Sequence, residues 1–286
     1  MKIIKYFFEF LIIYLFFIIF KILGYKNASN LGAIIGLLFG PLFRSKELVL
    51  NNLKKAFPNL NEYELIKISK NMWSNYGRIL SEYVFIKDFR NSKLEKFISI
   101  EGEEILKEIR KTKKTVVFIS GHLNNFELMA MQIEKSGINL AAIFRPLNNF
   151  FLNKTMEKIR KNYICKNQIP KGLMGMRKIL KFFKEGTSVA LMIDQRVSQG
   201  ISSNFFSHPA LTTTIPGQLV KKFNCWVVPV CIERTDKHKF RMIVNKPIKF
   251  NENETIESIT NSLNLWLEKI ILKNPSQWIW THNRWK

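Results

Sequence analysis

The sequence is poor in the residues that build metal sites and disulfide-bonded folds. Its 286 residues include only three cysteines and four histidines. The cysteines are Cys165, Cys225 and Cys231. Because their number is odd and they form no Cys-x-x-Cys motif, we expect reduced thiols in a reducing compartment. No His/Cys cluster has the spacing of a zinc site, and His-Glu-x-x-His is absent. The sequence therefore predicts neither a bound metal nor a disulfide framework.

Three motifs that mark common enzyme classes are also missing. The chain has no Gly-x-Gly-x-x-Gly, no phosphate-loop motif and no Gly-x-Ser-x-Gly elbow. The first two absences argue against a nucleotide cofactor, and we expect no cofactor of any kind. The third argues against a serine nucleophile of the hydrolase type, and hence against an acyl-enzyme formed on one.

Acidic residues are scarce. There are 45 Lys and Arg against 22 Asp and Glu, a net charge of +23, and only three of the acidic residues are aspartates. Such a charge predicts an acidic partner, which can be nucleic acid, an anionic membrane, a phosphorylated substrate or an acidic protein. Ten of the cations lie between Lys154 and Lys184. This basic run is either a solvated helix face or a surface for phosphates or an acidic protein.

A long apolar run lies near the N-terminus. Residues Ile3 to Phe20 are apolar except for Lys5 and Glu9, but the uninterrupted part, residues 10–20, is shorter than the ~20 residues that usually span a bilayer. No small-residue cleavage site follows, and the excess of cations after the run predicts a cytoplasmic body. We expect residues 1–25 to anchor the protein to a membrane, across it or in its plane, and residues 26–286 to form one domain.

A second apolar stretch covers residues 31–43. It is interrupted by Gly32, Gly36, Gly40 and Pro41, and its composition suits the membrane interface. We therefore expect this stretch to lie in the membrane interface.

The remaining chain alternates between β-branched runs and helical patterns. Asn61 and Glu64 have the spacing of a capping box, which predicts a helix from there to about Phe85. The predicted strands are 115–120, 140–144, 187–193, 225–232 and 240–244. The predicted helices are 126–135, 149–163, 174–184, 213–223 and 254–272. This alternation predicts an α/β fold with a largely parallel central sheet flanked by helices.

Polar residues follow several of the predicted strands. His122 lies in a Gly-marked turn between a strand and a helix, and Glu127 follows five residues later. A His-x4-Glu match also arises by chance, but the strand–turn–helix context favours a general base, His122, oriented by Glu127. Asp194 and Arg145 follow two other strands. Each is either a cap or turn residue, or part of a site at the carboxyl edge of the sheet.

Six blocks together resemble the bacterial late acyltransferases of lipid A biosynthesis, within the His-x4-Asp/Glu glycerolipid acyltransferases. The blocks occur in the family's order and cover nearly the whole chain. They are His122–Glu127, Phe144-Arg-Pro-Leu-Asn-Asn149, Arg160, Ile193-Asp-Gln195, Asn204–Thr214 and Pro275–Lys286. One position departs from the pattern, because Arg196 stands where the family often has an acidic residue.

The resemblance implies transfer of a fatty acyl group from acyl-acyl carrier protein to a hydroxyl of an anionic, phosphorylated lipid A precursor. It implies an enzyme at the bacterial inner membrane with its catalytic domain on the cytoplasmic side, and no nucleic-acid partner. Asn125, Arg145, Arg160 and Asp194 would bind substrate or the oxyanion. Two alternatives stay open at this stage: an acyltransferase for another membrane glycerolipid or glycolipid, and a non-catalytic basic membrane protein.

Overall fold

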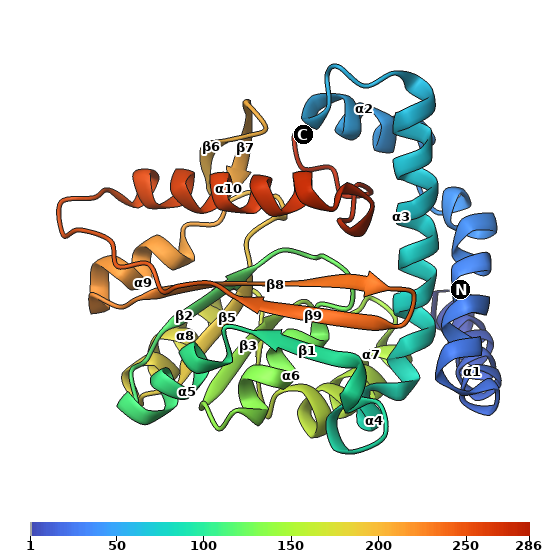
Figure 1. Ribbon diagram of the computed structural model, residues 1–286, viewed down its shortest axis with the longest axis horizontal. Coiled ribbons are helices and arrows are strands. Elements are labelled where there is room, and N and C mark those ends of the chain that lie inside the picture. The colour runs from blue at the N-terminus through green and yellow to red at the C-terminus, as the bar shows by residue number, and fades with distance from the viewer. Residues whose placement is uncertain (1) are drawn as a thin grey trace.

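The computed structural model describes residues 2–286 as an α/β body with a helical N-terminal extension (Figure 1). Seven strands form the central sheet in the order β1-β9-β8-β2-β5-β3-β4, and within it only β8 and β9 pair antiparallel. These strands are β1 (Ile98–Glu101), β2 (Val117–Ser120), β3 (Leu140–Phe144), β4 (Asn167–Pro170), β5 (Ser188–Met192), β8 (Val227–Asp236) and β9 (Lys239–Val244). A separate hairpin joins β6 (Ile201–Phe205) to β7 (His208–Thr212). The predicted largely parallel α/β fold is confirmed.

Helices cover both faces of the sheet. The α-helices of the chain are α1 (Lys2–Phe39), α2 (Lys46–Ala56), α3 (Glu62–Glu82), α4 (Ile86–Asn91), α5 (Glu103–Thr112), α6 (Glu127–Lys135), α7 (Phe150–Ile159), α8 (Leu173–Lys184), α9 (Ile215–Phe223) and α10 (Ile256–Lys273). In Figure 1, α10 lies on one side of the sheet and α5 and α6 on the other. Successive residues of β2 supply the two cores, since Val117 and Ile119 pack with α8, α9 and α10, whereas Phe118 packs with α4, α5 and α6. A strand buried on both faces is apolar throughout, which is why the sequence of β2 belongs to a continuous apolar run.

The predicted strands and helices are present with shifted ends, but the two edge strands of the sheet were missed. The capping box is formed, because Asn61 accepts from the backbone N–H of Glu64 and the Glu64 carboxylate accepts from that of Asn61. Edge strands β1 and β4 escaped prediction because each is four residues long and neither forms an apolar run. The predicted helix 149–163 is two segments, α7 and a π-helical turn, η4 (Arg160–Ile164).

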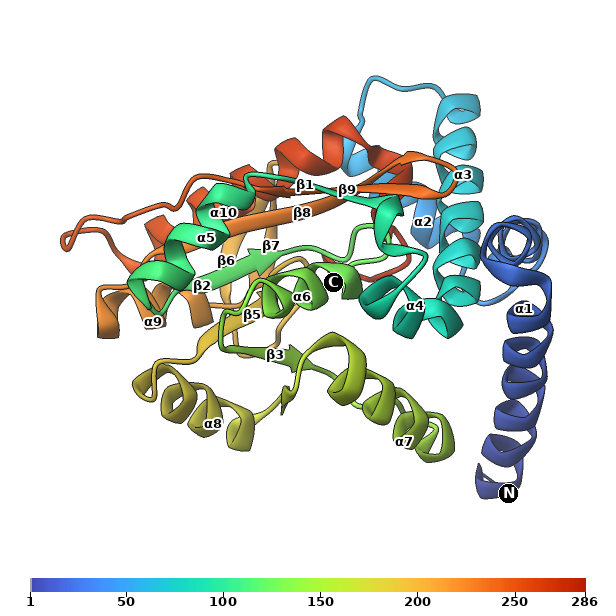
Figure 2. The ribbon, with the colours of Figure 1, turned by 60° about the horizontal axis from the view of Figure 1, so that its bottom comes forward.

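The first half of α1 extends beyond the α/β body (Figure 2). The helix bends at Gly24, whose φ of 74° is a left-handed conformation that glycine adopts without strain. Residues 2–23 therefore form a rod about 33 Å long at 1.5 Å per residue, close to the ~30 Å thickness of a bilayer core. Most of its apolar side chains are exposed, including Ile4, Phe8 and Ile22, whereas Phe20 is buried. Within residues 2–286, this is the one helix long and apolar enough to cross a membrane.

The second half of α1 packs against α3 through glycines. A Cβ on Gly77 of α3 would lie 1.9 Å from the carbonyl oxygen of Gly32, and a Cβ on Gly36 would lie 2.3 Å from that of Trp73. Residues 31–39 thus continue the helix, which ends where a 3₁₀ turn, Gly40–Leu42, begins. The glycines serve close backbone approach between two helices, which composition alone does not distinguish from a helix break.

Candidate functional site

The carboxyl ends of the central strands bring His122 and Asp194 together. His122 lies two residues beyond β2 and Asp194 two residues beyond β5, and these strands are neighbours in the sheet. The His122 ring Nδ1 lies 2.7 Å from Asp194 Oδ1, and the backbone N–H of His122 donates to Oδ2 at 2.7 Å. The Asp194 side chain is fully buried, whereas 21% of the His122 side chain is exposed. The pair therefore presents one ring edge outward from a buried carboxylate.

The two groups stabilise each other's charged forms. Burial alone would raise the pKa of Asp194, but the charge of His122 and hydrogen bonds from His122 and Trp278 outweigh it, and the pKa falls to about 2. Burial likewise opposes the imidazolium, but the Asp194 carboxylate outweighs it and raises the pKa of His122 above its ordinary value. With Nδ1–H donated to Asp194, the neutral ring carries its lone pair on Nε2. Within residues 2–286, no hydrogen bond is made to Nε2.

Glu127 contacts Arg160 and not the imidazole. Both Nε and Nη2 of Arg160 donate to Glu127 Oε1, at 2.8 and 2.6 Å, and each side chain is 12% exposed. The expectation that Glu127 holds the ring of His122 is therefore wrong, since Asp194 occupies that position. The reason is local: Glu127 is the first residue of α6, beyond the turn, and its carboxylate lies against η4.

Three features of Arg160 matter for binding. Its Nη1 is buried and has no partner among residues 2–286. Burial works against its charge, but Glu127 and Tyr83 together outweigh burial and raise the pKa of Arg160. The guanidinium also lies over the Phe144 ring, 5.7 Å from its centroid. Arg160 is thus a fixed cation with one free donor.

A cavity of about 550 Å³ opens beside the pair. That volume lies within the usual range for small-molecule sites. Its polar lining residues include His122, Glu127, Arg145, Arg160, Gln195 and His282, at or near the carboxyl edge of the sheet. The rest of the lining includes an apolar group between α6 and the sheet, formed by Phe118, Ala130, Ile133, Ala142, Ala190 and Val230. The cavity therefore has a rim of polar and charged side chains and an apolar interior.

Positive charge dominates the cavity lining. Arg44, Arg145 and Lys171 contribute to it, and none forms an ion pair within residues 2–286. Burial and the Arg145 charge together lower the pKa of Lys171. The one carboxylate of the lining, Glu127, is occupied by Arg160.

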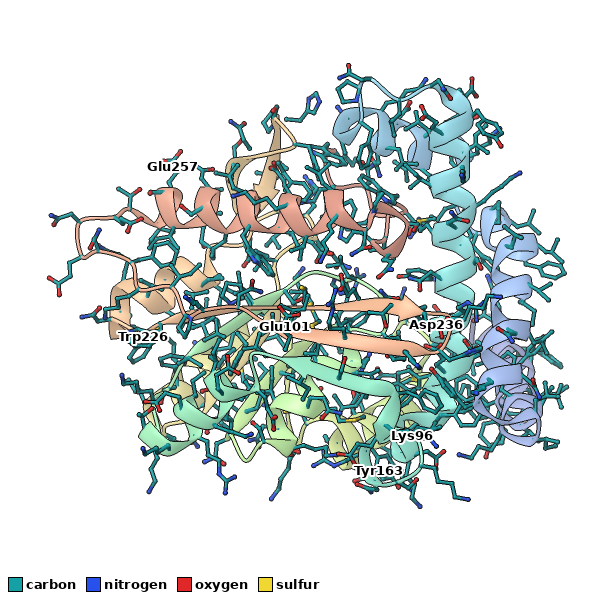
Figure 3. All side chains as sticks on the ribbon, in the orientation of Figure 1. Lys96, Glu101, Tyr163, Trp226, Asp236 and Glu257 are labelled. Carbon is teal, nitrogen blue, oxygen red and sulfur yellow. The ribbon has the colours of Figure 1, made fainter. Side chains whose placement is uncertain are left out.

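Asn125 does not line this cavity. It is fully buried, and its amide donates to Glu82 Oε2 at 3.3 Å. Glu82 also receives both terminal nitrogens of Arg234 from β8, at 2.8 and 3.0 Å, and the Ser29 hydroxyl of α1 at 2.8 Å. The β8–β9 hairpin, whose tip carries Asp236, reaches α3 in this way (Figure 3). Asn125 thus ties the turn that carries His122 to the α1–α3 pair, which differs from the expected role in substrate binding.

The C-terminal segment also contacts the turn that carries His122. Asn124 has a left-handed φ of 47°, and its backbone N–H donates to the carbonyl of Gln277 at 2.9 Å. Leu123 forms a bridge with Trp278, whose indole N–H donates to Asp194 Oδ2 at 2.8 Å. His282 accepts from the backbone N–H of Arg196 at 3.0 Å. The resemblance included Pro275–Lys286 as a family block, but sequence reasoning gave Trp278 and His282 no individual role.

The cysteines lie apart from the cavity. All three are buried free thiols in the apolar cores, and burial raises the pKa of each to about 12. Ser120, at the end of β2, is also buried, and its hydroxyl contacts Gly121 O and Met129 Sδ rather than His122. Among residues 2–286 the histidine is therefore not paired with a serine or cysteine nucleophile.

Comparison with known proteins gives one family over the whole chain. A family model described as bacterial lipid A biosynthesis acyltransferase matches residues 1–286. A lipid A biosynthesis acyltransferase of Haemophilus influenzae is 26% identical over 274 residues, covering 92% of this chain and 86% of that one. A lipid A biosynthesis lauroyltransferase of Escherichia coli K12 is 25% identical over 253 residues, covering 85% and 79%. A palmitoleoyltransferase of lipid A biosynthesis from the same strain is 22% identical over 269 residues, covering 92% and 86%.

Proposed function

Since the chain belongs to the bacterial lipid A biosynthesis acyltransferase family and is an acyltransferase, we propose that it moves a fatty acyl group from acyl-acyl carrier protein to a hydroxyl of a lipid A precursor. The observation that carries the proposal is the His122–Asp194 pair at the rim of a cavity with an apolar interior. The reaction needs a base for the acceptor hydroxyl and an apolar cleft for the acyl chain. In this protein His122 lines the cavity whose interior is apolar.

His122 acts as the general base. Its Nε2 takes the proton of the acceptor hydroxyl as the oxygen attacks the thioester carbonyl. Asp194 keeps the ring in the tautomer with Nδ1–H and stabilises the imidazolium that forms. The imidazolium then returns the proton to the leaving thiolate. Because no serine or cysteine is paired with His122, the acyl group passes directly from donor to acceptor without an acyl-enzyme.

Arg160 stabilises the oxyanion. Its Nε and Nη2 are held by Glu127, which leaves the buried Nη1 to donate to the carbonyl oxygen as negative charge develops there. Glu127 therefore acts through Arg160. A guanidinium fixed by two hydrogen bonds needs no reorganisation during the reaction. Donors preorganised in this way give the largest electrostatic stabilisation of a transition state.

The acyl chain lies between α6 and the sheet. Each CH₂ group buried there contributes about 0.8 kcal/mol of binding, so the apolar lining binds the donor chain and orients its carbonyl toward the rim. The three cations without ion pairs at the cavity, Arg44, Arg145 and Lys171, suit the phosphates of an anionic glycolipid acceptor.

The basic run docks the acidic carrier protein. Nine of its ten cations are exposed, Arg160 being the exception. Reversing Lys158, Lys161 and Lys178 to Glu should raise KM for acyl-acyl carrier protein, with kcat nearly unchanged and the defect reduced by salt.

A control for that variant carries the same change of charge elsewhere. Lys222, Lys239 and Lys269 are exposed on α9, β9 and α10. Reversing these three to Glu should leave KM close to wild type. Equal KM values for the two triple variants would assign the basic run to solvent.

We place the enzyme at the bacterial inner membrane with its catalytic domain on the cytoplasmic side. Residues 2–23 supply an exposed apolar rod of bilayer length, and most cations follow the rod in sequence. Residues 1–25 form the anchor and residues 26–286 the acyltransferase domain.

The defining experiment is an acyl-transfer assay of the wild-type protein and of the variant His122→Ala. Purified protein should transfer labelled acyl chains from acyl-acyl carrier protein to a lipid A precursor, and mass spectrometry should show the acceptor gaining one acyl group. His122→Ala should lower kcat by about 10² or more while the protein remains folded. Near-normal turnover by folded His122→Ala would reject the assignment of the base.

A further inference from the structure

Asp194 receives a hydrogen bond that the mechanism above does not use. The indole Nε1–H of Trp278 donates to Oδ2, the carboxylate oxygen that also accepts the backbone N–H of His122, while Oδ1 faces the His122 ring. Trp278 is 1% exposed. Its backbone pairs with Leu123, the residue after His122. The C-terminal segment is therefore attached both to the base and to the base's partner.

We propose that Trp278 is a positioning residue that tunes the basicity of His122 through Asp194, as the third member of a Trp278–Asp194–His122 relay. This inference rests on the proposed role of His122 as the base. The indole N–H has two effects on the carboxylate. It fixes the rotation of the carboxylate, so that Oδ1 stays in line with Nδ1, and it offsets part of the negative charge.

The partial offset of the carboxylate charge determines in which direction Trp278 changes the basicity of His122. A carboxylate without the indole donor concentrates its charge toward the ring and stabilises the imidazolium more strongly. His122 would then hold its proton at a pH where the wild-type ring is a free base. Trp278 thus keeps the base available while Asp194 orients it.

Other charged and titratable groups face the pair from every element around it. They are Glu127 of α6, Arg160 of η4, Tyr76 of α3, and His282 and Arg284 of the C-terminal segment. Within residues 2–286, none of them hydrogen-bonds to Trp278. Removing the indole N–H therefore leaves their effect on His122 in place, and a change in the pH profile reports on the relay.

Trp280 provides a matched control. It is 0% exposed, and its ring lies 4.6 Å from that of Trp278 in an edge-to-face pair. Its indole N–H donates to the carbonyl of Pro275 at 2.7 Å, not to Asp194. Phe at either position removes similar buried area and one indole donor, but only at Trp278 does the lost donor belong to the relay.

The test is the pH dependence of kcat/KM for full-length Trp278→Phe and Trp280→Phe. We expect the acidic limb of Trp278→Phe to move up by about 0.5–1 pH unit, which makes activity about three- to tenfold lower on that limb. Trp280→Phe should lower thermal stability but leave the limb at its wild-type pH. If Trp278→Phe does not fold, β-(3-benzothienyl)alanine at position 278 keeps the shape of tryptophan and lacks the N–H.

An unshifted acidic limb in a folded Trp278→Phe or benzothienyl protein would overturn the proposal, as would an equal shift in Trp280→Phe. His122→Ala separates this failure from a failure of the proposed function. If His122→Ala is inactive and the Trp278→Phe limb is unshifted, only the relay is wrong. If His122→Ala is active, the base itself is misassigned.

Discussion

Replacing Asp194 by Asn tests the corrected assignment of the residue that orients the base. Asn has the same shape, but one carboxylate oxygen becomes an NH₂ group. Three N–H groups point at Asp194: two at Oδ2, from the His122 backbone and Trp278, and the ring N–H of His122 at Oδ1. An amide oxygen can satisfy only one of these two sides.

The arrangement that loses fewer hydrogen bonds places the amide oxygen toward the two donors. The amide NH₂ then faces Nδ1 of His122, which must become an acceptor. The ring proton moves to Nε2, and the nitrogen that faces the cavity no longer accepts a proton. In the serine-protease triad the same wrong tautomer costs about 10⁴ in kcat. We expect Asp194→Asn to lower kcat by about 10³–10⁴, or about 4–5.5 kcal/mol of barrier, with KM little changed.

The assay is steady-state acyl transfer in detergent micelles, with thermal unfolding to confirm a folded protein. Glu127→Gln is the comparison, because it weakens the hold on Arg160 but leaves the His122 tautomer intact. It should lower kcat without the loss of base function. A folded Asp194→Asn protein with a kcat within tenfold of wild type would refute the reasoning. If Glu127→Gln instead showed the large loss of kcat expected for Asp194→Asn, Glu127 would return to the orienting role.

Three further outcomes follow from the structure. Arg160→Ala should lower kcat, and Arg160→Lys should rescue it poorly, because a single ammonium cannot hold Glu127 through two donors and still offer a third to the oxyanion; wild-type kcat in Arg160→Lys would contradict this. Deleting residues 1–25 should release protein from membranes in a flotation assay while the rest still folds; full retention would assign attachment to other surfaces. The folded-state pKa of Asp194, about 2, lies below its ordinary 3.8, so its ionisation stabilises the fold above about pH 4 and contributes about 2 kcal/mol that is lost as pH falls toward 2. Acid unfolding of Asp194→Asn should lack that part of the pH dependence.

The sequence by itself determined the fold class, an α/β fold with a largely parallel sheet, and the edge of that sheet at which the site lies. Continuous apolar runs such as residues 115–119 mark strands buried on both faces, and parallel strands place their carboxyl ends together. His122, Arg145 and Asp194 could therefore be assigned to one edge. The family blocks extended that assignment to Arg160, whose place on a π-helical turn no periodicity indicated.

Only the tertiary structure decided which of these groups touch. Spacing along the chain favoured Glu127 as the partner of His122, because the two are five residues apart. The pairing of β2 with β5 instead sets Asp194, 72 residues away, against the ring, and the start of α6 turns Glu127 toward Arg160. Trp278 reaches the same carboxylate from the end of the chain. Hydrogen bonds depend on directions and distances of a few tenths of an ångström, which strand register and helix packing fix and which residue order along the chain does not record.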